Sequence, residues 1–366
     1  MRRGQLTQRQ LFYIMFLLMV PTIYFLPVAD LIRLGGRWSF WSPFVVALPS
    51  AALTCWLGRA AARHGSLFAA AQGAVGPVLT RALAGVLWLC LGTMVTFILR
   101  EVSDQAGLSF IYGRVPAGVV LLTTAAAGVY MALLGVVVMA RVAAILFAIN
   151  LVLTALINLA ALGGAHLLWV LPLLPRTTDF LRVEPLVRIS WWLTEPMLGV
   201  LLVQRLGPDA RRHAGRIMAV AVLLGATIMS LVVFTVTAFG GPQYEARVTL
   251  PGYSLLSEIR LSDMLPTHIE TLANPLIVVT SVLKVALFLW MWAAAGHVAW
   301  RMPRPWLLVG GCGVATAVAG LALDAFRVEW GVYAIIGRYV VPATVTGLVL
   351  VYVSQAARRR VPVARP

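Results

Sequence analysis

Charged residues are scarce in this chain of 366 residues, and no long polar region interrupts it. Asp, Glu, Lys and Arg make up 11% of the sequence, against 61% hydrophobic residues and a mean hydropathy of +0.90. Soluble domains carry about 25% charged residues, so the composition excludes an ordinary soluble fold. The longest polar gap runs only from about Gly240 to Glu270. We therefore predict an all-α integral membrane protein in which residues 1–366 form a single polytopic membrane domain.

Cysteine and histidine are also rare, which argues against several kinds of site. The three cysteines, Cys55, Cys90 and Cys312, fall inside apolar stretches and lack the spacing of metal ligands or of a disulfide framework. The five histidines are scattered, and no glycine-rich loop suited to phosphates is present. The sequence thus predicts no cofactor, no metal site, no catalytic residues and no enzymatic activity.

What the chain has in abundance is apolar stretches of roughly 20 residues, each long enough to cross ~30 Å of hydrocarbon. A short turn near Met139-Ala140-Arg141 is expected between the fourth and the fifth. The ten divide into five and five, with approximate halves 1–165 and 180–354. The predicted spans lie at about residues 11–32, 40–58, 79–99, 116–135, 139–162, 185–205, 215–239, 271–295, 305–323 and 332–354.

The basic residues are distributed unevenly between the two sides of these spans. With the N-terminus inside, 17 of the 29 Lys and Arg residues lie on the cytoplasmic side. This is the positive-inside pattern, and it places both termini in the cytoplasm of a multi-pass bacterial membrane protein. The net charge of +16 is then explained by topology and by attraction to anionic membrane lipids, and nucleic acid is not an expected partner.

Two of the ten spans are interrupted at corresponding places. In the first span Pro21 and Pro27 flank the segment Thr22-Ile23-Tyr24, and in the sixth Glu195-Pro196 lies at mid-depth. Unwound backbone inside a membrane is tolerated where it lines a cavity, and paired breaks of this kind mark the midplane site of inverted-repeat transporters. A simple packing kink is the alternative for each break. We predict a five-plus-five inverted repeat (LeuT-like) with the first and sixth helices broken.

Three charged residues lie deep in predicted spans: Glu195, Lys284 and Arg338. A charge at the bilayer centre costs about 3 kcal/mol, so such groups face the bundle interior and need a partner or water. Glu195 and Lys284 either form one structural ion pair or line a ligand cavity, and both readings stay open. Arg338 lies early in its span, where its side chain can also reach outward to the interface.

Polar and aromatic residues complete a candidate site for a small zwitterion, held by the ends of broken helices with hydroxyls and an aromatic lid. The alternative is that the threonines bond to their own helix and that the aromatic rings only pack. The predicted ligand-binding residues are Pro21, Thr22, Ile23, Thr93, Thr96, Phe97, Trp192, Thr194, Glu195, Lys284 and Phe288.

Several short motifs resemble a known family. The spacing seen in GerAB-type spore germination proteins is found in Ser66-Leu67-Phe68 with Gly73 and Gly76, in Ala140-Arg141, in Glu195, and in Leu250-Pro251 with Leu255-Leu256, Asp263 and Ile269-Glu270. These proteins are B subunits of endospore germinant receptors, in the amino acid–polyamine–organocation transporter superfamily. The resemblance covers essentially the whole chain, and it implies a germinant-sensing subunit of the spore inner membrane that acts with A and C subunits.

The segment after the seventh span carries the most specific part of this resemblance. We expect residues 240–270 to lie outside the cytoplasm, with Ser254–Leu265 forming an amphipathic helix that Pro251 starts and Pro266 ends. The chain departs from the family at Val20-Pro21-Thr22, where the family usually has glycines that admit a ligand carboxylate. It also has Thr267-His268 where the family often has Glu-Arg.

Three functions are compatible with the sequence. The resemblance implies a receptor subunit that binds a small germinant, an amino acid, at the midplane. The broken helices alone favour an amino-acid or cation-coupled secondary transporter, a permease. The altered first break favours a purely structural assembly subunit.

Overall fold

A computed structural model describes most of the chain. The described residues are 5–22, 26–64, 67–109, 116–175, 178–183, 186, 189, 192, 195–248, 251–259, 270–302, 305–322, 343 and 347. The predicted tenth span, 332–354, lies outside them except for its residues 343 and 347, and Arg338 lies outside as well.

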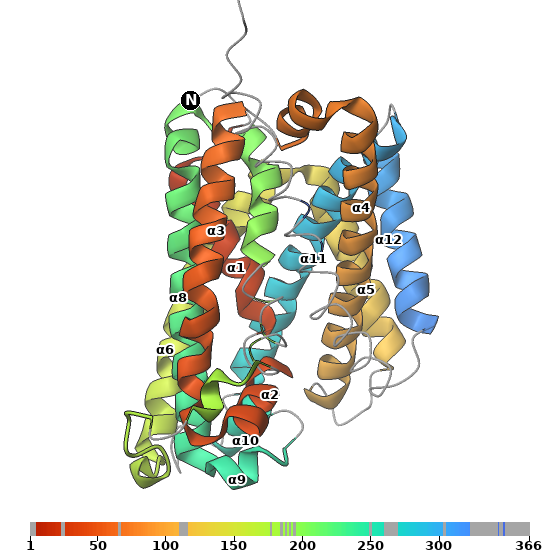
Figure 1. Cartoon of the computed structure of the whole chain (residues 1–366). Coiled ribbons are helices and arrows are strands. Elements are labelled where there is room, and N and C mark those ends of the chain that lie inside the picture. The colour runs from red at the N-terminus through yellow and green to blue at the C-terminus, as the bar shows by residue number, and fades with distance from the viewer. Residues whose placement is uncertain are drawn as a thin grey trace, which may run out of the picture.

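The described part of the chain is a bundle of long helices with no strand among its regular elements (Figure 1). Six stretches are long and apolar enough to cross a membrane, and Trp306–Ala322 is a shorter apolar helix. The protein is therefore an all-α, multi-pass membrane protein. The six stretches are Val28–Arg63, Val75–Asp104, Ala117–Leu134, Val136–Gly163, Pro208–Gly240 and Ala273–Trp300.

The first predicted span consists of two helices. The first, α1 (Gln8–Met19), begins in a capping box, in which Thr7 and Gln10 each accept a hydrogen bond from the other's backbone N–H. It passes into a 3₁₀ turn, η1 (Val20–Thr22), and a new helix, α2 (Leu26–Gly35), follows. Pro27 sits in the first turn of α2, where its missing N–H costs nothing. The next 3₁₀ segment, η2 (Gly36–Trp41), leads into α3 (Ser42–His64).

The sixth predicted span changes its helical type at the expected place. Leu186, Ile189 and Trp192 have helical backbone, and an 11-residue 3₁₀ helix, η5 (Glu195–Arg205), begins at the Glu195-Pro196 pair. Runs of 3₁₀ helix beyond three or four residues are uncommon and often mark functional hinges. The end of η5 is tied to the start of the chain, because Leu6 N–H donates to the Arg205 carbonyl at 2.8 Å and Gly207 N–H donates to the Leu6 carbonyl at 3.1 Å.

Glycine residues set two further boundaries. The long element α4 (Leu67–Ser109) is two helices joined at Gly76, whose φ is +81°. Gly135, with φ +89°, separates α5 (Ala117–Leu134) from α6 (Val136–Gly163). The turn predicted near Met139-Ala140-Arg141 was wrong, since these residues lie inside α6 and only Gly135 readily adopts the left-handed backbone that the turn requires.

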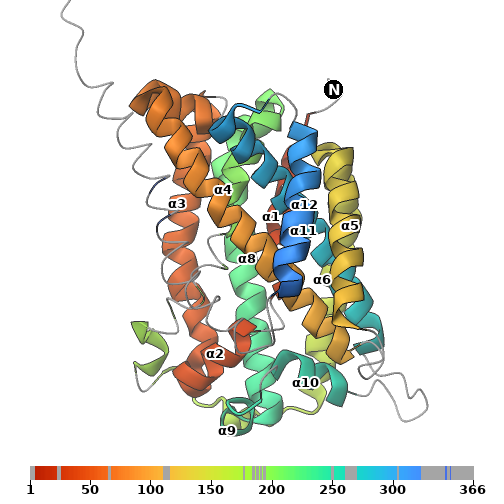
Figure 2. The ribbon, with the colours of Figure 1, turned by 90° about the vertical axis from the view of Figure 1, so that its right-hand side faces the viewer.

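The remaining long helices complete the bundle. They are α8 (Pro208–Gly240), α11 (Glu270–Trp300) and α12 (Pro305–Ala322). In the view of Figure 2, α4 crosses the bundle diagonally, with α5 and α12 to one side of it. The short 3₁₀ turns η3 (Leu167–Trp169) and η4 (Asp179–Leu181) belong to the connection between the halves.

The segment after α8 carries two short helices at the end of the bundle opposite the N-terminus, α9 (Pro242–Glu245) and α10 (Pro251–Glu258) (Figures 1 and 2). The start of α10 at Pro251 is three residues before the predicted Ser254. Ile259 is already outside the helix, so the predicted extent of Ser254–Leu265 is wrong there, while residues 260–269 lie outside the described part. The helix is amphipathic, with Leu255 and Leu256 buried and Glu258 exposed.

The centre of the bundle is filled by α1, whose side chains from Ile14 to Met19 are at most 1% exposed. It packs against α6, α8 and α11. Phe147 of α6 anchors one side of it, with ring centroids 4.7 Å from Tyr13 and 5.1 Å from Phe16. The half of α1 from Ile14 to Met19 therefore has no lipid-facing surface.

Candidate functional site

Glu195 and Lys284 meet in the interior. Glu195 is the first residue of η5, and Lys284, the single lysine of the chain, lies near the middle of the 31-residue α11. The Lys284 ammonium donates to Glu195 Oε2 at 2.8 Å, and both side chains are completely shielded from solvent. The structure thus joins the break of the sixth span to the eighth span by a direct ion pair.

The pair accounts for how both charges can be carried inside a membrane protein. Each ion alone costs several kcal/mol to bury, and their attraction at contact distance offsets this cost only when hydrogen bonds satisfy the rest of both groups. Removal of either partner would leave a buried, uncompensated charge. The two residues therefore act as a unit in stability, whatever else they do.

The carboxylate of Glu195 is only partly satisfied. Its Oε1 is buried and has no hydrogen-bond partner among the described residues. A carboxylate has about four acceptor positions, and an unfilled one in a dry interior costs about 1–3 kcal/mol. Glu195 Oε1 is therefore ready to accept a hydrogen bond from a donor that the described chain does not supply.

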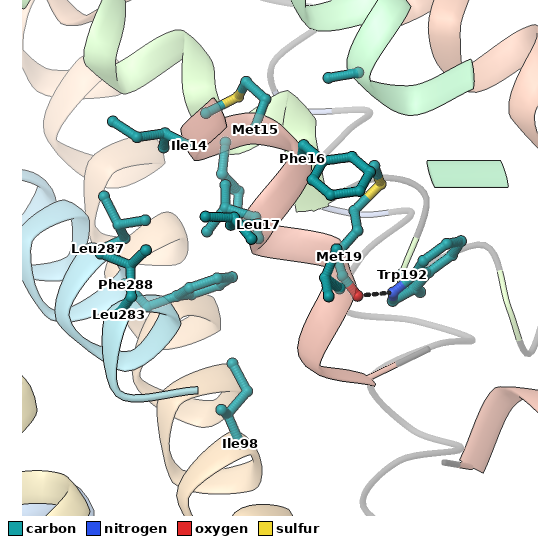
Figure 3. Packing of buried hydrophobic residues seen from close by; sticks show 14 of the residues in the cluster. Ile14, Met15, Phe16, Leu17, Met19, Ile98, Trp192, Leu283, Leu287 and Phe288 are labelled. Atoms are coloured by element: carbon teal, nitrogen blue, oxygen red, sulfur yellow. Dashed lines mark hydrogen bonds between the residues drawn. The ribbon is translucent and has the colours of Figure 1, made fainter. Parts of the chain in front are cut away.

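Aromatic and apolar side chains enclose the region around the first break. The Phe288 ring, one turn along α11, lies with its centroid 6.0 Å from the Lys284 ammonium, within the range of a cation–π contact. Figure 3 shows Phe288 and Leu287 of α11 facing α1, with Ile98 of α4 below them. In this conformation the ion pair is sealed, and a ligand could reach it only if these elements moved apart.

The two broken spans are also linked by a hydrogen bond. The Trp192 indole N–H donates to the Met19 carbonyl at 2.8 Å (Figure 3). Met19 is the last residue of α1, and carbonyls in the last turn of a helix lack partners within it. Trp192 supplies such a partner, so the segment before Glu195 is held directly against the first break.

The other predicted site residues are placed in different ways. Pro21 is buried in η1, Thr22 ends that turn, and Phe97 is buried on α4. Thr96 is half-buried and Thr93 is exposed; their hydroxyls donate within α4 to the Gly92 and Leu89 carbonyls at 3.0 and 2.9 Å. This is the back-bonding given above as the alternative for both threonines. Ile23 and Thr194 lie outside the described residues.

Sequence reasoning missed two polar contacts between helices. Asn150 of α6 donates to the Thr280 hydroxyl of α11 at 3.1 Å, and the Thr235 hydroxyl of α8 donates to Asn158 of α6 at 2.7 Å. All four side chains are buried. Asparagines inside an apolar span are the signal that would have found them, because hydrogen bonds between helices stabilise membrane bundles.

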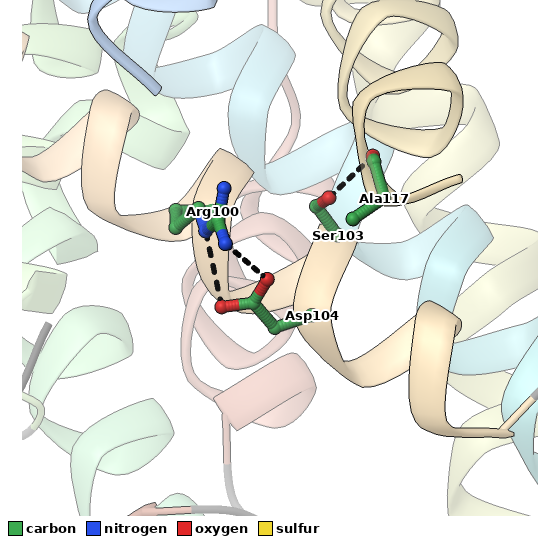
Figure 4. A network of polar contacts seen from close by, with 4 residues as sticks. All are labelled: Arg100, Ser103, Asp104 and Ala117. Atoms are coloured by element: carbon green, nitrogen blue, oxygen red, sulfur yellow. Dashed lines mark hydrogen bonds and ion pairs between the residues drawn. The ribbon is translucent and has the colours of Figure 1, made fainter. Parts of the chain in front are cut away.

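A third missed contact lies on α4. Arg100 and Asp104 form an ion pair at 2.9 Å, and the Ser103 hydroxyl donates to the Ala117 carbonyl at the start of α5 (Figure 4). Arg100 and Asp104 are four residues apart, which is the spacing of side-chain pairs on one helix face. Elsewhere among the described residues, no three His, Cys, Asp or Glu side chains lie together as metal ligands.

Comparison with known proteins identifies a family and a related fold. The family model described as spore germination protein matches residues 5–320. No curated protein matches the sequence significantly. Among solved structures, the Eremococcus coleocola manganese transporter, in complex with an aromatic bis-isothiourea substituted compound, superposes with a TM-score of 0.53 at 16% identity. The match covers 93% of this chain and 77% of the transporter, and it shows that the two share a fold, the LeuT-like arrangement predicted above.

Proposed function

Because the chain belongs to the spore germination protein family and has a transporter fold, we propose that it is the membrane subunit of a spore germinant receptor. In this proposal it binds a small germinant, an amino acid, between its two broken helices. The family and the fold are those of permeases and transporters, and they favour recognition of a solute over catalysis.

The observation that carries this proposal is the open acceptor of Glu195. Its Oε1 is buried beside a helix break and has no partner among the described residues, while Oε2 is taken by Lys284. The α-ammonium group of an amino acid is a charged donor of the right kind, because charge-assisted hydrogen bonds to carboxylates are about twice as strong as neutral ones. In this proposal Lys284, whose ammonium contacts Glu195, receives the ligand carboxylate.

Enclosure of the pair implies that binding is coupled to movement. A ligand at Glu195 must separate Phe288 and the Trp192–Met19 contact from their present positions. Since a ligand shifts a conformational equilibrium only through its different affinity for the two states, a germinant that binds the opened state would favour it. This is the behaviour that a receptor subunit needs to pass a signal onward.

Partners and location follow from the same assignment. We propose that A and C subunits of the receptor receive the signal, and that the protein resides in the spore inner membrane with both termini cytoplasmic. The asymmetry of basic residues supports this orientation. In this proposal the Glu195–Lys284 pair lies near the midplane and residues 240–270 lie on the outer side.

A secondary transporter of amino acids or cations is the second candidate, and the fold match favours it directly. Reconstitution separates the two functions. Accumulation of labelled amino acid in proteoliposomes would support transport, whereas binding without accumulation would support a receptor.

The test is a binding screen of the amino acids against the purified protein, read by thermal stabilisation. We expect at least one amino acid to bind the wild type. Glu195→Gln leaves Lys284 without its anion and should lower Tm, and at a temperature where this variant is still folded it should bind that amino acid about tenfold or more weakly. Glu258→Gln is the matched control, because it makes the same chemical change at an exposed carboxylate. Unchanged affinity in Glu195→Gln would refute the site, and no binding at millimolar concentration would favour the structural assembly subunit.

A further inference from the structure

A second charged region lies at the other end of the bundle from α9 and α10, beside the start of the chain. It is a cavity of about 790 Å³ in which four arginines converge. Arg59 and Arg63 come from the last turns of α3, and Arg211 and Arg212 from the first turns of α8. The rest of the described lining is uncharged: Gln5, Ala62, Leu206 and Pro208.

A close crossing of two helices brings these arginines together. A Cβ atom on Gly58 of α3 would lie 2.6 Å from the Gly215 Cα of α8, and a Cβ on Gly215 would lie 2.1 Å from the Cys55 carbonyl oxygen. The backbones therefore touch, as small residues permit in membrane helices. Arg59 directly follows Gly58, and Arg211 lies one turn before Gly215. The crossing therefore brings both arginines to the lining of one cavity.

These positive charges are not neutralised by the described chain. None of the four arginines forms an ion pair with a described carboxylate. Asp209 stands in the first turn of α8, but it makes no salt bridge to them. Like charges that line one cavity repel one another, so the arrangement is costly unless an anion or solvent ions occupy the space between them.

Arg211 shows the need for an acceptor most directly. One of its terminal nitrogens, Nη2, has a long hydrogen bond of 3.4 Å to the Leu206 carbonyl, and its Nε is buried without a partner among the described residues. A guanidinium has five donors arranged as a fork that fits the oxygens of phosphate or carboxylate. The capping residue of α8, Gly207, has no side chain to accept from the N-terminal N–H groups, which adds a partial positive charge nearby.

We propose that this cavity binds a phosphate group. Four arginines, an unsatisfied guanidinium nitrogen and a helix N-terminus form a set of donors suited to a polyanionic tetrahedral group. The phosphate belongs either to the headgroup of an anionic phospholipid or to a free phosphate compound. Basic pockets between helices on the cytoplasmic side of membrane proteins are suited to such headgroups.

A bound phosphate would add a further link between elements that already pack together. The cavity touches α3, α8 and the segment around Leu6, and Leu6 is bonded to Arg205 at the end of η5. The occupant would stabilise this end of both broken spans. This site is separate from the Glu195–Lys284 pair, and it stands whether or not an amino acid binds there.

The test uses the full-length purified protein in a neutral detergent, with thermal unfolding measured at constant ionic strength. Three probes are compared with chloride: inorganic phosphate, phosphatidylglycerol and the zwitterionic lipid phosphatidylcholine. We expect a rise in Tm with phosphate or phosphatidylglycerol. Stabilisation by phosphatidylglycerol alone assigns the site to a lipid headgroup, and stabilisation by inorganic phosphate assigns it to a free phosphate compound.

Variants then locate the effect. Arg211→Gln should weaken binding of the stabilising probe by about tenfold. Arg59→Gln, a second variant on the other helix, should weaken it by a similar factor. Arg216→Gln is the matched control, because Arg216 is an exposed arginine of α8 that does not line the cavity. The proposal is overturned if neither phosphate probe raises Tm above chloride, or if Arg216→Gln weakens the effect as much as Arg211→Gln.

Discussion

The Glu195–Lys284 pair and the arginine cavity handle charge in opposite ways. In the first, one carboxylate and one ammonium are fully buried and neutralise each other at 2.8 Å. In the second, four arginines line an open cavity without a described anion. Deep inside the bundle, desolvation is so costly that the chain must supply both signs of charge. Near the end of the bundle, water can solvate the arginines and an anionic ligand can supply the second sign of charge.

A third region shows a third way of handling charge. Glu245 of α9 is almost fully buried and its Oε2 has no partner among the described residues, yet no cation pairs with it there. Burial, with a smaller contribution from the negative charge of Glu258, raises the pKa of Glu245 to about 8. Here a proton does what Lys284 does for Glu195. The comparison of these regions can be tested by changing each compensating element in turn.

The largest effect is expected at the interior pair. Lys284→Met leaves the Glu195 carboxylate buried without its cation, and the free energy of unfolding should fall by about 3–5 kcal/mol. The double variant Glu195→Gln with Lys284→Met should lose less than Lys284→Met alone, because no uncompensated charge remains. Thermal unfolding of the single and double variants in detergent measures both quantities. Purely additive losses would show that the two residues are not coupled.

A smaller effect is expected at the crossing that builds the arginine cavity. Gly215→Ala places a methyl group 2.1 Å from the Cys55 carbonyl, so α3 and α8 must separate, at a cost of about 1–3 kcal/mol. The same separation should reduce binding of phosphate. Gly85→Ala on α4 is the control, since nothing lies within 4 Å of its added Cβ, and it should be neutral or stabilising. Equal stability of the two variants would contradict the close crossing.

The smallest effect is a dependence of stability on pH from Glu245. Its pKa is about 8 in the folded protein against 4.5 as the ordinary value, so the folded state holds a proton that the unfolded state has released. Stability from this group is fully present below about pH 4.5 and is lost as the pH rises toward 8.

Glu245→Gln should remove this loss and flatten the profile of Tm against pH over that window. Glu258→Gln should leave most of the slope in place, because burial is the larger cause of the raised pKa. A wild-type profile that rises between pH 5 and 8 would show that other groups dominate the titration.

Much of the fold could be predicted because its causes are local in the sequence. The length and apolarity of the spans, and the positions of Pro21, Pro27 and Pro196, located the helices and both breaks. The turn between α5 and α6 was misplaced because apolar residues continue across it, and only the left-handed backbone of Gly135 marks the boundary. The extent of α10 was wrong because the spacing of its apolar residues continues past Glu258, and only packing at the end of the bundle decides where such a short helix stops.

The candidate site was less predictable, for a physical reason. Deep charges must find partners, so Glu195 and Lys284 could be singled out, but sequence alone left their direct pairing open. The helical spacing of Thr93, Thr96 and Phe97 predicts that they lie near one another on α4. It does not predict how α4 is rotated about its axis, and in the structure Thr93 is exposed while Phe97 is buried. The arginine cavity could not be predicted because its two pairs, Arg59 with Arg63 and Arg211 with Arg212, are far apart in the chain, and the positive-inside pattern already accounts for each arginine.

The 3₁₀ geometry of η5 has one more consequence. At about 2 Å of rise per residue, its 11 residues extend about 22 Å, where an α-helix of equal length would reach only about 16 Å. With three residues per turn, every third side chain falls in a straight column. Glu195, Leu198, Leu201 and Gln204 form one such column, and Gln204 lines a second cavity of about 530 Å³ beside Trp290 and His297. Along this column, the buried side chains of Leu198 and Leu201 therefore separate the Glu195 carboxylate from that cavity.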